Sequence, residues 1–370
     1  MDRRRFLATS GGLLVAFALP LPAACSTDRR AAGPGSHTAY LRIGDDGAVT
    51  LYSPTSEMGQ GTHTGQALIV AEELSVPVDR IRVETAEPAD PFRRNGSMSS
   101  GGSWGLRYWH DPLRKAAAQA REMLIAAAAA RLSVPADELR AESGQVTHAA
   151  SGRSVGFGAL AAEAAAFAPP ADPPVRTAAT RRGDAIAPRL DIPAKVRGEP
   201  VFAADVVRPG MVYACARLSP VFGATVESLD PAPALAVAGV LKVVGIPGGA
   251  AVVAGNSWAA MRGAEALDIR FAATPHDALD SATISRQMRA GLSGDSRAIE
   301  ARSDGDPAAA FAAAQEVFEA TYEAPYLAHA ALEPWSCTLE RDAEGVLHLW
   351  APCQAQDRFL AAAAEAAGIP

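Results

Sequence analysis

Residues 57–66 read EMGQGTHTGQ and lie between a strand-like run ending at residue 52 and a helix expected across residues 66–74. Glycine lets the backbone approach a ligand closely and point successive N–H groups at it. The start of a helix just beyond adds partial positive charge that suits a phosphate. Gln60 offers one donor and one acceptor to a heterocycle. The run is neither a Walker loop nor a G-x-G-x-x-G fingerprint, so taken alone it favours a plain turn.

A second glycine-rich run, NGSMSSGGSWG, occupies residues 95–105. Its main-chain amides and serine hydroxyls can wrap a polar, anionic ligand, and the alternative is a solvated, flexible loop. We expect the amides near residues 60 and 101 to converge on one ligand. Four aromatic residues near this run stack on an aromatic substrate or belong to the core: Phe92, Trp104, Tyr108 and Trp109.

A third segment, HAALEP, covers residues 329–334, with Gln354 further along the chain. His329 and Glu333 are four apart and would share one face of a helix. Pro334 and the neighbouring strand-like runs argue against a regular helix, so a hydrogen-bonded turn is favoured over a metal pair. We therefore assign no metal ligand.

The remaining pattern predicts an α+β chain. Residues 44–47 (GDDG) indicate a hairpin turn between strands, and LSVP recurs at 74–77 and 132–135 between a helix and a strand. That repeat is either a true structural repeat or two helices that stop alike. Strands are expected at 40–43, 49–52, 81–84, 212–215, 240–244, 250–253, 316–322 and 346–350, and further helices at 112–132, 258–267, 307–314 and from 354.

Composition excludes several classes of protein. The chain has 370 residues with 34 basic and 41 acidic side chains, a net charge of −7, and 49% hydrophobic residues, which is typical of a globular protein. No basic stripe stands out, so nucleic acid is not an expected partner. The four cysteines form no C-x-x-C pair, which excludes an iron–sulfur cluster of the usual close spacing. Cys337 and Cys353 either pair or, as we favour, stay separate thiols.

The N-terminus reads MDRRRFL, a twin-arginine export pattern followed by an apolar run at 13–19. That run is shorter than the roughly 20 residues that span a bilayer, and Ala23-Ala24 suits cleavage. We expect residues 1–24 to be a removed signal, with an uncleaved anchor as the alternative, and the protein to reside in the periplasm. A lipid at Cys25 is the less favoured variant, because Pro22 spoils the lipobox. Export of folded protein by this route favours a bound redox cofactor.

The ordered motifs EMGQGT (57–62), SSGGS (99–103) and PLRK (112–115) resemble the start of molybdopterin-binding large subunits of the xanthine dehydrogenase/aldehyde oxidase family, of the isoquinoline 1-oxidoreductase beta type. Residues 191–198 (DIPAKVRG), 202–205 (FAAD) and 209–211 (PGM) resemble the hammerhead domain of that family. Residues 326–334 (YLAHAALEP) resemble the opening of a further molybdopterin-binding domain.

The resemblance implies an α+β fold with seven regions: a signal (1–24), a flexible leader (25–37), a molybdopterin-binding α/β region (38–165), a linker (166–189), a hammerhead-like domain (190–273), a loop (274–306), and an incomplete start of a further molybdopterin-binding domain (307–370). Family large subunits continue further, with a Phe-containing glycine loop and a late Glu that acts as general base. We assign no residue to that role, and we expect this stretch alone to be inactive. Leu327 stands where xanthine dehydrogenases have Gln.

By the same resemblance, the cofactor is molybdopterin with molybdenum, in a cytosine dinucleotide form. The cofactor-binding residues it implies are Gly59, Gln60, Gly61, Thr62, Ser100, Gly101, Gly102 and Ser103. The implied reaction is hydroxylation of aldehydes or N-heterocycles with oxygen from water. Electrons would leave through a separate small subunit with two [2Fe–2S] clusters, with a cytochrome c as a further acceptor. Two alternatives stay open: a non-catalytic exported partner that needs another chain, and a periplasmic solute-binding or lipoprotein module.

Overall fold

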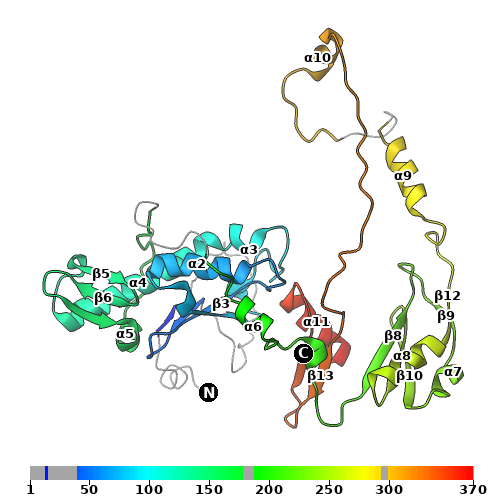
Figure 1. Ribbon diagram of the computed structural model, residues 1–370, viewed down its shortest axis with the longest axis horizontal. Helices are drawn as coiled ribbons and strands as arrows, with labels where there is room; N and C mark the ends of the chain where they lie inside the picture. Colours follow the sequence, from blue (N-terminus) through cyan, green and yellow to red (C-terminus); the bar gives the residue numbers. More distant parts are fainter. Residues whose placement is uncertain (1–12, 16–39, 178–186, 293–298, 370) are drawn as a thin grey trace. The chain divides into compact units, whose positions relative to one another are not determined.

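The computed structural model describes residues 13–15, 40–177, 187–292 and 299–369. The chain forms two compact units. The first unit comprises residues 1–205 with 335–370, and the second unit comprises residues 206–334. Helices and strands are mixed throughout both units, as expected for an α+β protein (Figure 1).

The main sheet of the first unit has the order β1 (Leu13–Val15), β2 (Leu41–Ile43), β3 (Val49–Ser53) and β4 (Ile81–Thr85). The predicted hairpin is confirmed, because β2 and β3 pair antiparallel across the 44–47 turn. β3 and β4 run parallel, joined by a crossover that contains helix α2 (Thr62–Leu74). β3 is buried at every position, which agrees with its place inside the sheet.

Part of the predicted signal segment lies in this sheet. Strand β1 pairs antiparallel with β2, Leu13 opposite Ile43. The other residues of the predicted signal and leader, Cys25 included, lie outside the described part of the chain.

Helix α4 (His110–Leu132) packs against α2 and covers the core of the first unit. The helix expected at 112–132 is confirmed and begins two residues earlier, with Pro112 in its first turn. Most of the buried face of α4 is alanine, which lets α2 approach closely. Tyr40 and Phe92 meet edge to face, with ring centroids 5.2 Å apart, in the same core.

The LSVP repeat is a helix stop used twice. Ser75 and Ser133 follow α2 and α4 in the left-handed conformation, with φ of 54° and 53°. The amides of Val76 and Val134 donate to carbonyls five residues back. Each stop leads through a short 3-10 turn, η1 (Val78–Arg80) or η3 (Ala136–Glu138), into a strand, β4 or β5 (Leu139–Glu142). The two helices therefore stop alike for the same physical reason.

A second small sheet, β5, β6 (Gln145–His148) and β7 (Arg153–Gly156), leads into helix α5 (Phe157–Ala164). Gly158 of α5 packs against the 44–47 turn of the main sheet. A Cβ built on Gly158 would overlap the Asp45 carbonyl oxygen and would lie 2.5 Å from the Gly47 nitrogen. Both neighbours are backbone, so neither can swing away.

We expect Gly158→Ala to lower the free energy of unfolding by about 2–3 kcal/mol, because the hairpin and α5 must separate to admit the methyl group. Gly156→Ala is the matched control. No atom lies within 4 Å of its added Cβ, so we expect a loss below about 1 kcal/mol. Chemical denaturation of the two variants measures the difference. Equal losses would contradict the close approach of α5 to the turn.

The first unit also contains α6 (Ile192–Val196), the 3-10 turn η4 (Ala203–Asp205), the hairpin β13 (Thr338–Arg341) with β14 (Leu347–Trp350), and helix α11 (Gln356–Ala367). Thr338 Oγ1 donates to the Ala203 carbonyl at 3.1 Å and joins the early and late parts of this unit. The expected strand at 346–350 and the helix after 354 are confirmed. Residues 190–205 and 335–369 thus belong to the first unit, so the expected boundaries at 190 and 307 do not coincide with those of the units.

The second unit contains a sheet β10 (Val240–Ile246), β11 (Gly249–Ala254), β8 (Tyr213–Leu218), all antiparallel, and a ribbon of β12 (Asp268–Phe271) with β9 (Val226–Asp230). Helices α7 (Ala232–Leu235) and α8 (Ser257–Ala266) pack on β10 and β11. The three strands and the helix expected between residues 212 and 267 are confirmed. Strands β9 and β12 were not predicted.

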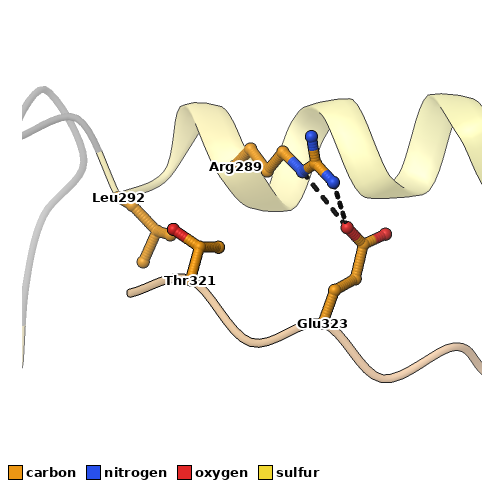
Figure 2. A pocket seen from close by; sticks show the side chains of 4 residues that line it. All are labelled: Arg289, Leu292, Thr321 and Glu323. Atoms are coloured by element: carbon orange, nitrogen blue, oxygen red, sulfur yellow. Dashed lines mark hydrogen bonds and ion pairs between the residues drawn. The ribbon is translucent and has the colours of Figure 1, made fainter. Parts of the chain in front are cut away.

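Two further helices, α9 (Ser281–Ala290) and α10 (Pro307–Ala313), follow in the second unit. Arg289 Nε of α9 donates to Glu323 at 3.2 Å beside Leu292 and Thr321, which line a shallow hollow (Figure 2). This pair is exposed, so it contributes little to stability.

The strand expected at 316–322 is wrong. Described residues 315–331 carry neither helix nor strand, and Phe318 and Tyr322 are 86% and 93% exposed. An apolar run becomes a strand only where a neighbouring strand edge accepts its hydrogen bonds, and no strand pairs with these residues in the described chain.

No helix among the residues placed here is long and apolar enough to cross a bilayer.

Candidate functional site

The two glycine-rich runs lie side by side in the first unit. We call residues 54–61, between β3 and α2, the first loop, and residues 93–103, before α3 (Trp104–Arg107), the second loop. The Ser56 amide donates to Ser100 Oγ at 2.7 Å, so the two loops lie as close together as their expected convergence on one ligand requires. Ser100 is 7% exposed, so this bond is shielded from water.

A third segment, just before α11, closes on both loops. Ser56 Oγ donates to the Cys353 carbonyl at 3.0 Å, and the Ser100 amide donates to the Gln354 carbonyl at 2.6 Å. Ser99 and Ala355 form an isolated antiparallel bridge. Three segments far apart in the sequence therefore meet at Ser56 and Ser100.

Asp357 fixes the start of α11 to the second loop. Its side chain is 7% exposed and accepts hydrogen bonds from Ser97 Oγ at 3.2 Å and the Met98 amide at 3.1 Å. Arg93 Nε lies 3.3 Å from the same carboxylate. Nearby, both side-chain polar atoms of Gln356 are buried with no hydrogen-bond partner among the described residues. A buried, unpaired amide is costly, so this corner can accept a polar ligand.

Gln66 of α2 is fully buried and connects the two loops. Its Oε1 accepts from Ser53 Oγ at 2.7 Å, and its Nε2 donates to Thr55 Oγ1 at 3.1 Å and to the Gly105 carbonyl at 2.8 Å. One side chain thus holds the end of β3, the first loop and the start of α3 together.

Two glycines allow this close approach. A Cβ built on Gly105 would lie 2.8 Å from Thr62 Cγ2, and one on Gly65 would lie 2.8 Å from a Leu106 methyl carbon. The start of α2 and helix α3 therefore pack almost backbone to side chain. Thr62, an expected cofactor contact, is 7% exposed and packs in this interface.

The first loop satisfies its own donors. The Glu57 carboxylate accepts hydrogen bonds from the amides of Gly59 and Gly61, both at 2.9 Å, and of His63 at 3.0 Å. Burial of Glu57 opposes ionisation, but the three N–H groups outweigh it and lower the pKa of Glu57 below its usual range. The carboxylate therefore already occupies the loop amides that a phosphate would need as donors.

Gln60, also an expected cofactor contact, is folded onto its own loop. Its Oε1 accepts from the Met58 amide at 2.6 Å, and its Nε2 donates to the Ser56 carbonyl at 2.8 Å. Gly59 and Gly61 have φ of 99° and 80°, the left-handed conformation that this tight loop requires. Gln60 must therefore break these two hydrogen bonds before its side chain can turn away from the loop.

Arg189 closes the first loop from outside. Its Nη1 donates to the Gly59 carbonyl at 2.5 Å, and its Nη2 lies 3.4 Å from the Glu57 carboxylate. Asp191 holds the same guanidinium through two bonds of 2.9 and 2.6 Å. The hydrogen bond from Arg189, ahead of that from Lys195, keeps the pKa of Asp191 far below its usual range.

The second loop, in contrast, offers free donors. Gly101, Gly102 and Ser103 are exposed, and their amides make no hydrogen bond to another described residue. Gly102 and Ser103 adopt left-handed φ of 54° and 58°. Successive free amides beside two shielded serine contacts suit a phosphate, so these residues fit the anionic end of a dinucleotide cofactor.

The Glu57 contacts predict a pH dependence. A carboxyl with a lowered folded pKa contributes stability that is fully present above its ordinary pKa and is lost as the pH falls through the lower, folded value. In acid, we expect the amides of Gly59, Gly61 and His63 to exchange at least about tenfold faster than at neutral pH, after correction for the intrinsic pH dependence of exchange. In Glu57→Gln, the loop should exchange rapidly already at neutral pH, with little further change in acid. A wild-type pH profile in that variant would contradict this account.

The remaining candidates lie elsewhere. His329 and Glu333 belong to the second unit and are not on a helix, so they share no helix face. Among the described residues, no group of three His, Cys, Asp or Glu is placed to hold a metal ion. Cys337 and Cys353 are separate thiols, and burial raises the pKa of Cys353. Phe92 and Trp109 belong to the core, with 0% and 3% exposure.

Sequence reasoning missed Gln66, Asp357 and Arg189 as organising residues. Gln66 carried a weak signal, since it is a polar residue at a buried position of α2, but Thr62, Thr64 and Glu73 are buried on the same helix. Asp357 and Arg189 carried none, because the loop residues that they bind lie more than a hundred residues away in the chain.

Comparison with known proteins adds an independent finding. Two family models, both described as a molybdopterin cofactor-binding domain, match residues 18–190 and 293–370. The chain is 32% identical to the beta subunit of isoquinoline 1-oxidoreductase from Brevundimonas diminuta, over 96% of this chain and 52% of that protein. It is 28% identical to a membrane-bound aldehyde dehydrogenase [pyrroloquinoline-quinone] of Gluconacetobacter polyoxogenes, over 100% of this chain and 50% of the relative.

A third relative is a subunit of nicotinate dehydrogenase from Pseudomonas putida KT2440, 28% identical over 85% of this chain and 27% of that protein. The chain thus spans about half the length, or less, of the curated relatives it matches. The matched models together cover both loops and the third segment that closes on them. The chain belongs to the molybdopterin-binding large subunits of the xanthine dehydrogenase/aldehyde oxidase family.

Proposed function

We propose that this chain binds the anionic part of a molybdenum cofactor and serves an oxidoreductase that hydroxylates aldehydes or N-heterocycles with oxygen from water. The observation that carries the proposal is the meeting of three segments at Ser56 and Ser100, beside the free amides of residues 101–103. The names of the relatives, which include an isoquinoline oxidoreductase, an aldehyde dehydrogenase and a nicotinate dehydrogenase, support this substrate class.

When bound, such a cofactor supplies two-electron redox chemistry at its metal. This chain's residues position and shield it. Gly101, Gly102 and Ser103 donate main-chain hydrogen bonds to phosphate, and Ser100 holds the second loop against the first. Gln60 turns outward to contact the ring system once its bonds to Met58 and Ser56 open. No described residue is given the role of general base.

The proposal includes the cytosine dinucleotide form of the cofactor, a separate [2Fe–2S] subunit and a cytochrome c as electron acceptors, and export to the periplasm through the twin-arginine sequence at 3–5. The absence of a C-x-x-C pair supports a separate iron–sulfur subunit.

Cofactor loading tests the proposal. The polypeptide encoded by the full reading frame is co-expressed with its small subunit and the cofactor insertion machinery. Metal analysis should give about one molybdenum per polypeptide, and acid hydrolysis should release a cytidine nucleotide. The variant in which alanine replaces Gly102 should lose most of the metal, because the added Cβ would lie 2.7 Å from Trp104 Nε1.

Gly156→Ala is the matched control, since Gly156 lies outside both loops, no atom lies within 4 Å of its added Cβ and its φ is not positive. We expect it to retain the cofactor. Purified wild-type protein without molybdenum and pterin would contradict the proposal.

A second candidate, a non-catalytic exported partner, is favoured by one observation: Glu57 and Gln60 already satisfy the donors of the first loop. In that case the loop never opens. Hydrogen exchange at Gly59 and Gly61 that stays equally slow with and without the insertion machinery, together with absent molybdenum, would support it.

A further inference from the structure

Two arginines flank the free amides of the second loop and stack on one tryptophan. The Arg94 guanidinium carbon lies 3.6 Å from the Trp104 ring centroid, and that of Arg107 lies 4.5 Å from the same centroid. The same Arg94 carbon lies 5.2 Å from the centroid of the Tyr108 ring. The second loop therefore ends in a stack of two cations on one indole.

The chain holds Arg94 in this place by a tight turn. The amide of Arg94 donates to the Ser97 carbonyl at 2.8 Å, and the Ser97 amide donates back at 3.1 Å. Asn95 and Gly96 between them have φ of 50° and 78°, which is the Asn-Gly hairpin turn. Arg107 reaches the same ring from one turn along α3. The backbone at both arginines is therefore fixed, by the turn at Arg94 and by the helix at Arg107.

Neither guanidinium has an acidic partner among the described residues. Neighbouring Arg93 contrasts with them, since it pairs with Asp90 at 2.6 Å and with Asp357 at 3.3 Å. The whole chain carries a net charge of −7, so two adjacent unpaired cations are out of proportion with its average surface. Two positive charges held this close to one ring repel each other, and a bound anion would relieve that repulsion.

The free amides lie next to the same ring. A Cβ on Gly102 would come within 2.7 Å of Trp104 Nε1, so the Gly102 backbone runs along the indole N–H edge. Trp104 Nε1 itself donates to no described residue. Guanidinium groups with converging main-chain amides form the donor set that recognises phosphate. A carboxylate ligand would bind only one guanidinium group. A diphosphate has enough oxygens to bind both arginines and the amides.

We propose that Arg94, Arg107 and Trp104, with the amides of residues 101–103, form the seat of a diphosphate group. The proposal rests on the proposed function in that it assigns to this seat the diphosphate of the dinucleotide cofactor. The seat itself is a property of these residues, and a free nucleoside diphosphate has the same chemistry.

Binding to the cofactor-free protein tests the seat directly. Calorimetry with inorganic pyrophosphate, CDP and cytidine is done on the full polypeptide expressed without insertion machinery. Pyrophosphate and CDP should bind, and cytidine should not. Arg94→Gln and Arg107→Gln should each weaken pyrophosphate binding roughly tenfold, and the double variant roughly a hundredfold, since each removes one charge-assisted contact. Arg82→Gln is the matched control, because Arg82 is an exposed arginine of β4 paired with Glu84, and it should bind as wild type.

The source of the diphosphate is then read from the loaded protein. If cofactor-loaded protein no longer binds pyrophosphate, the seat holds the cofactor's own diphosphate. If loaded protein still binds CDP and loses it in the double variant, the seat serves a free nucleotide. Both results support the seat.

Failure of the seat and failure of the proposed function give different results. A double variant that binds pyrophosphate as wild type does, or a wild type that binds none of the probes, overturns the seat whatever its molybdenum content. Protein without molybdenum whose pyrophosphate binding still depends on Arg94 and Arg107 keeps the seat and overturns only its assignment to the cofactor.

Discussion

Replacing Gln66 with leucine is expected to separate the two loops and to abolish most cofactor binding. The variant removes the donor to the Gly105 carbonyl and the acceptor for Ser53 Oγ. Ser53 and Thr55 keep contacts with each other, so the carbonyl of Gly105 is the group left unpaired. A buried unpaired carbonyl costs about 1–3 kcal/mol, which we expect as the loss in free energy of unfolding.

The loss of cofactor should exceed what this destabilisation explains. Gly105 lies in the first turn of α3, two residues beyond the second loop, so release of its carbonyl lets residues 101–103 move away from Ser56. Gln119→Leu is the matched control, a buried glutamine of α4 with one hydrogen bond, to Pro170, and one unpaired oxygen. We expect it to lose less stability and to keep its cofactor. Denaturation and molybdenum content are measured on both variants, and equal molybdenum content would refute the role of Gln66.

The elements of the first sheet and its helices could be predicted because their signals are local. The GDDG turn, the Ala-rich periodic run before Leu132 and the LSVP stops each depend on a few neighbouring residues. The strands at 240–246 and 249–254 were likewise readable as apolar runs with glycine between them.

Strands β9 and β12 could not be predicted, because their sequences, VESLD and DIRF, are half charged or polar. They are strands because they pair with each other, Asp230 opposite Asp268. The reverse holds for residues 316–322, whose apolar content suggested a strand that has no partner among the described residues. In both cases tertiary pairing, which no local pattern contains, decides the outcome.

The residues of the site could be predicted from the sequence, but the hydrogen bonds among them could not. Motif resemblance selected the residues of both loops, and the structure adds which donors are free and which are used. That Glu57 would occupy the amides of Gly59 and Gly61 depends on one rotamer choice. Spacing in the sequence carries no information about that choice.

The segment at 166–189, expected as a linker, is partly bound to the first unit through a buried ionic cluster. Glu73 of α2 is 1% exposed and pairs with Arg121 at 2.9 Å and Arg114 at 3.1 Å. The amide of Arg176 donates to both oxygens of this carboxylate at 3.1 Å. Arg121, 7% exposed, also donates to the Pro174 carbonyl. Glu73 therefore holds α4 and the 170–176 segment on α2.

Replacing Glu73 with alanine should cost about 3–5 kcal/mol of unfolding free energy, because two arginines remain buried without a counter-charge. Glu73→Gln should cost less, since the amide oxygen still accepts one of the hydrogen bonds. Glu163→Gln is the matched control, as Glu163 pairs with Arg131 at 3.7 Å and is 46% exposed, and we expect less than about 1 kcal/mol.

Hydrogen exchange separates this role of Glu73 from a general loss of packing. If Glu73 fastens the segment, the Arg176 amide should exchange fast in Glu73→Ala under conditions where the amides of β3 remain protected. The two loops would then stay together, because the hydrogen bonds of Gln66 and Ser100 that join them do not involve Glu73. Simultaneous loss of protection in β3 and at Arg176 would show instead that the ionic cluster belongs to the same cooperative unit as the sheet.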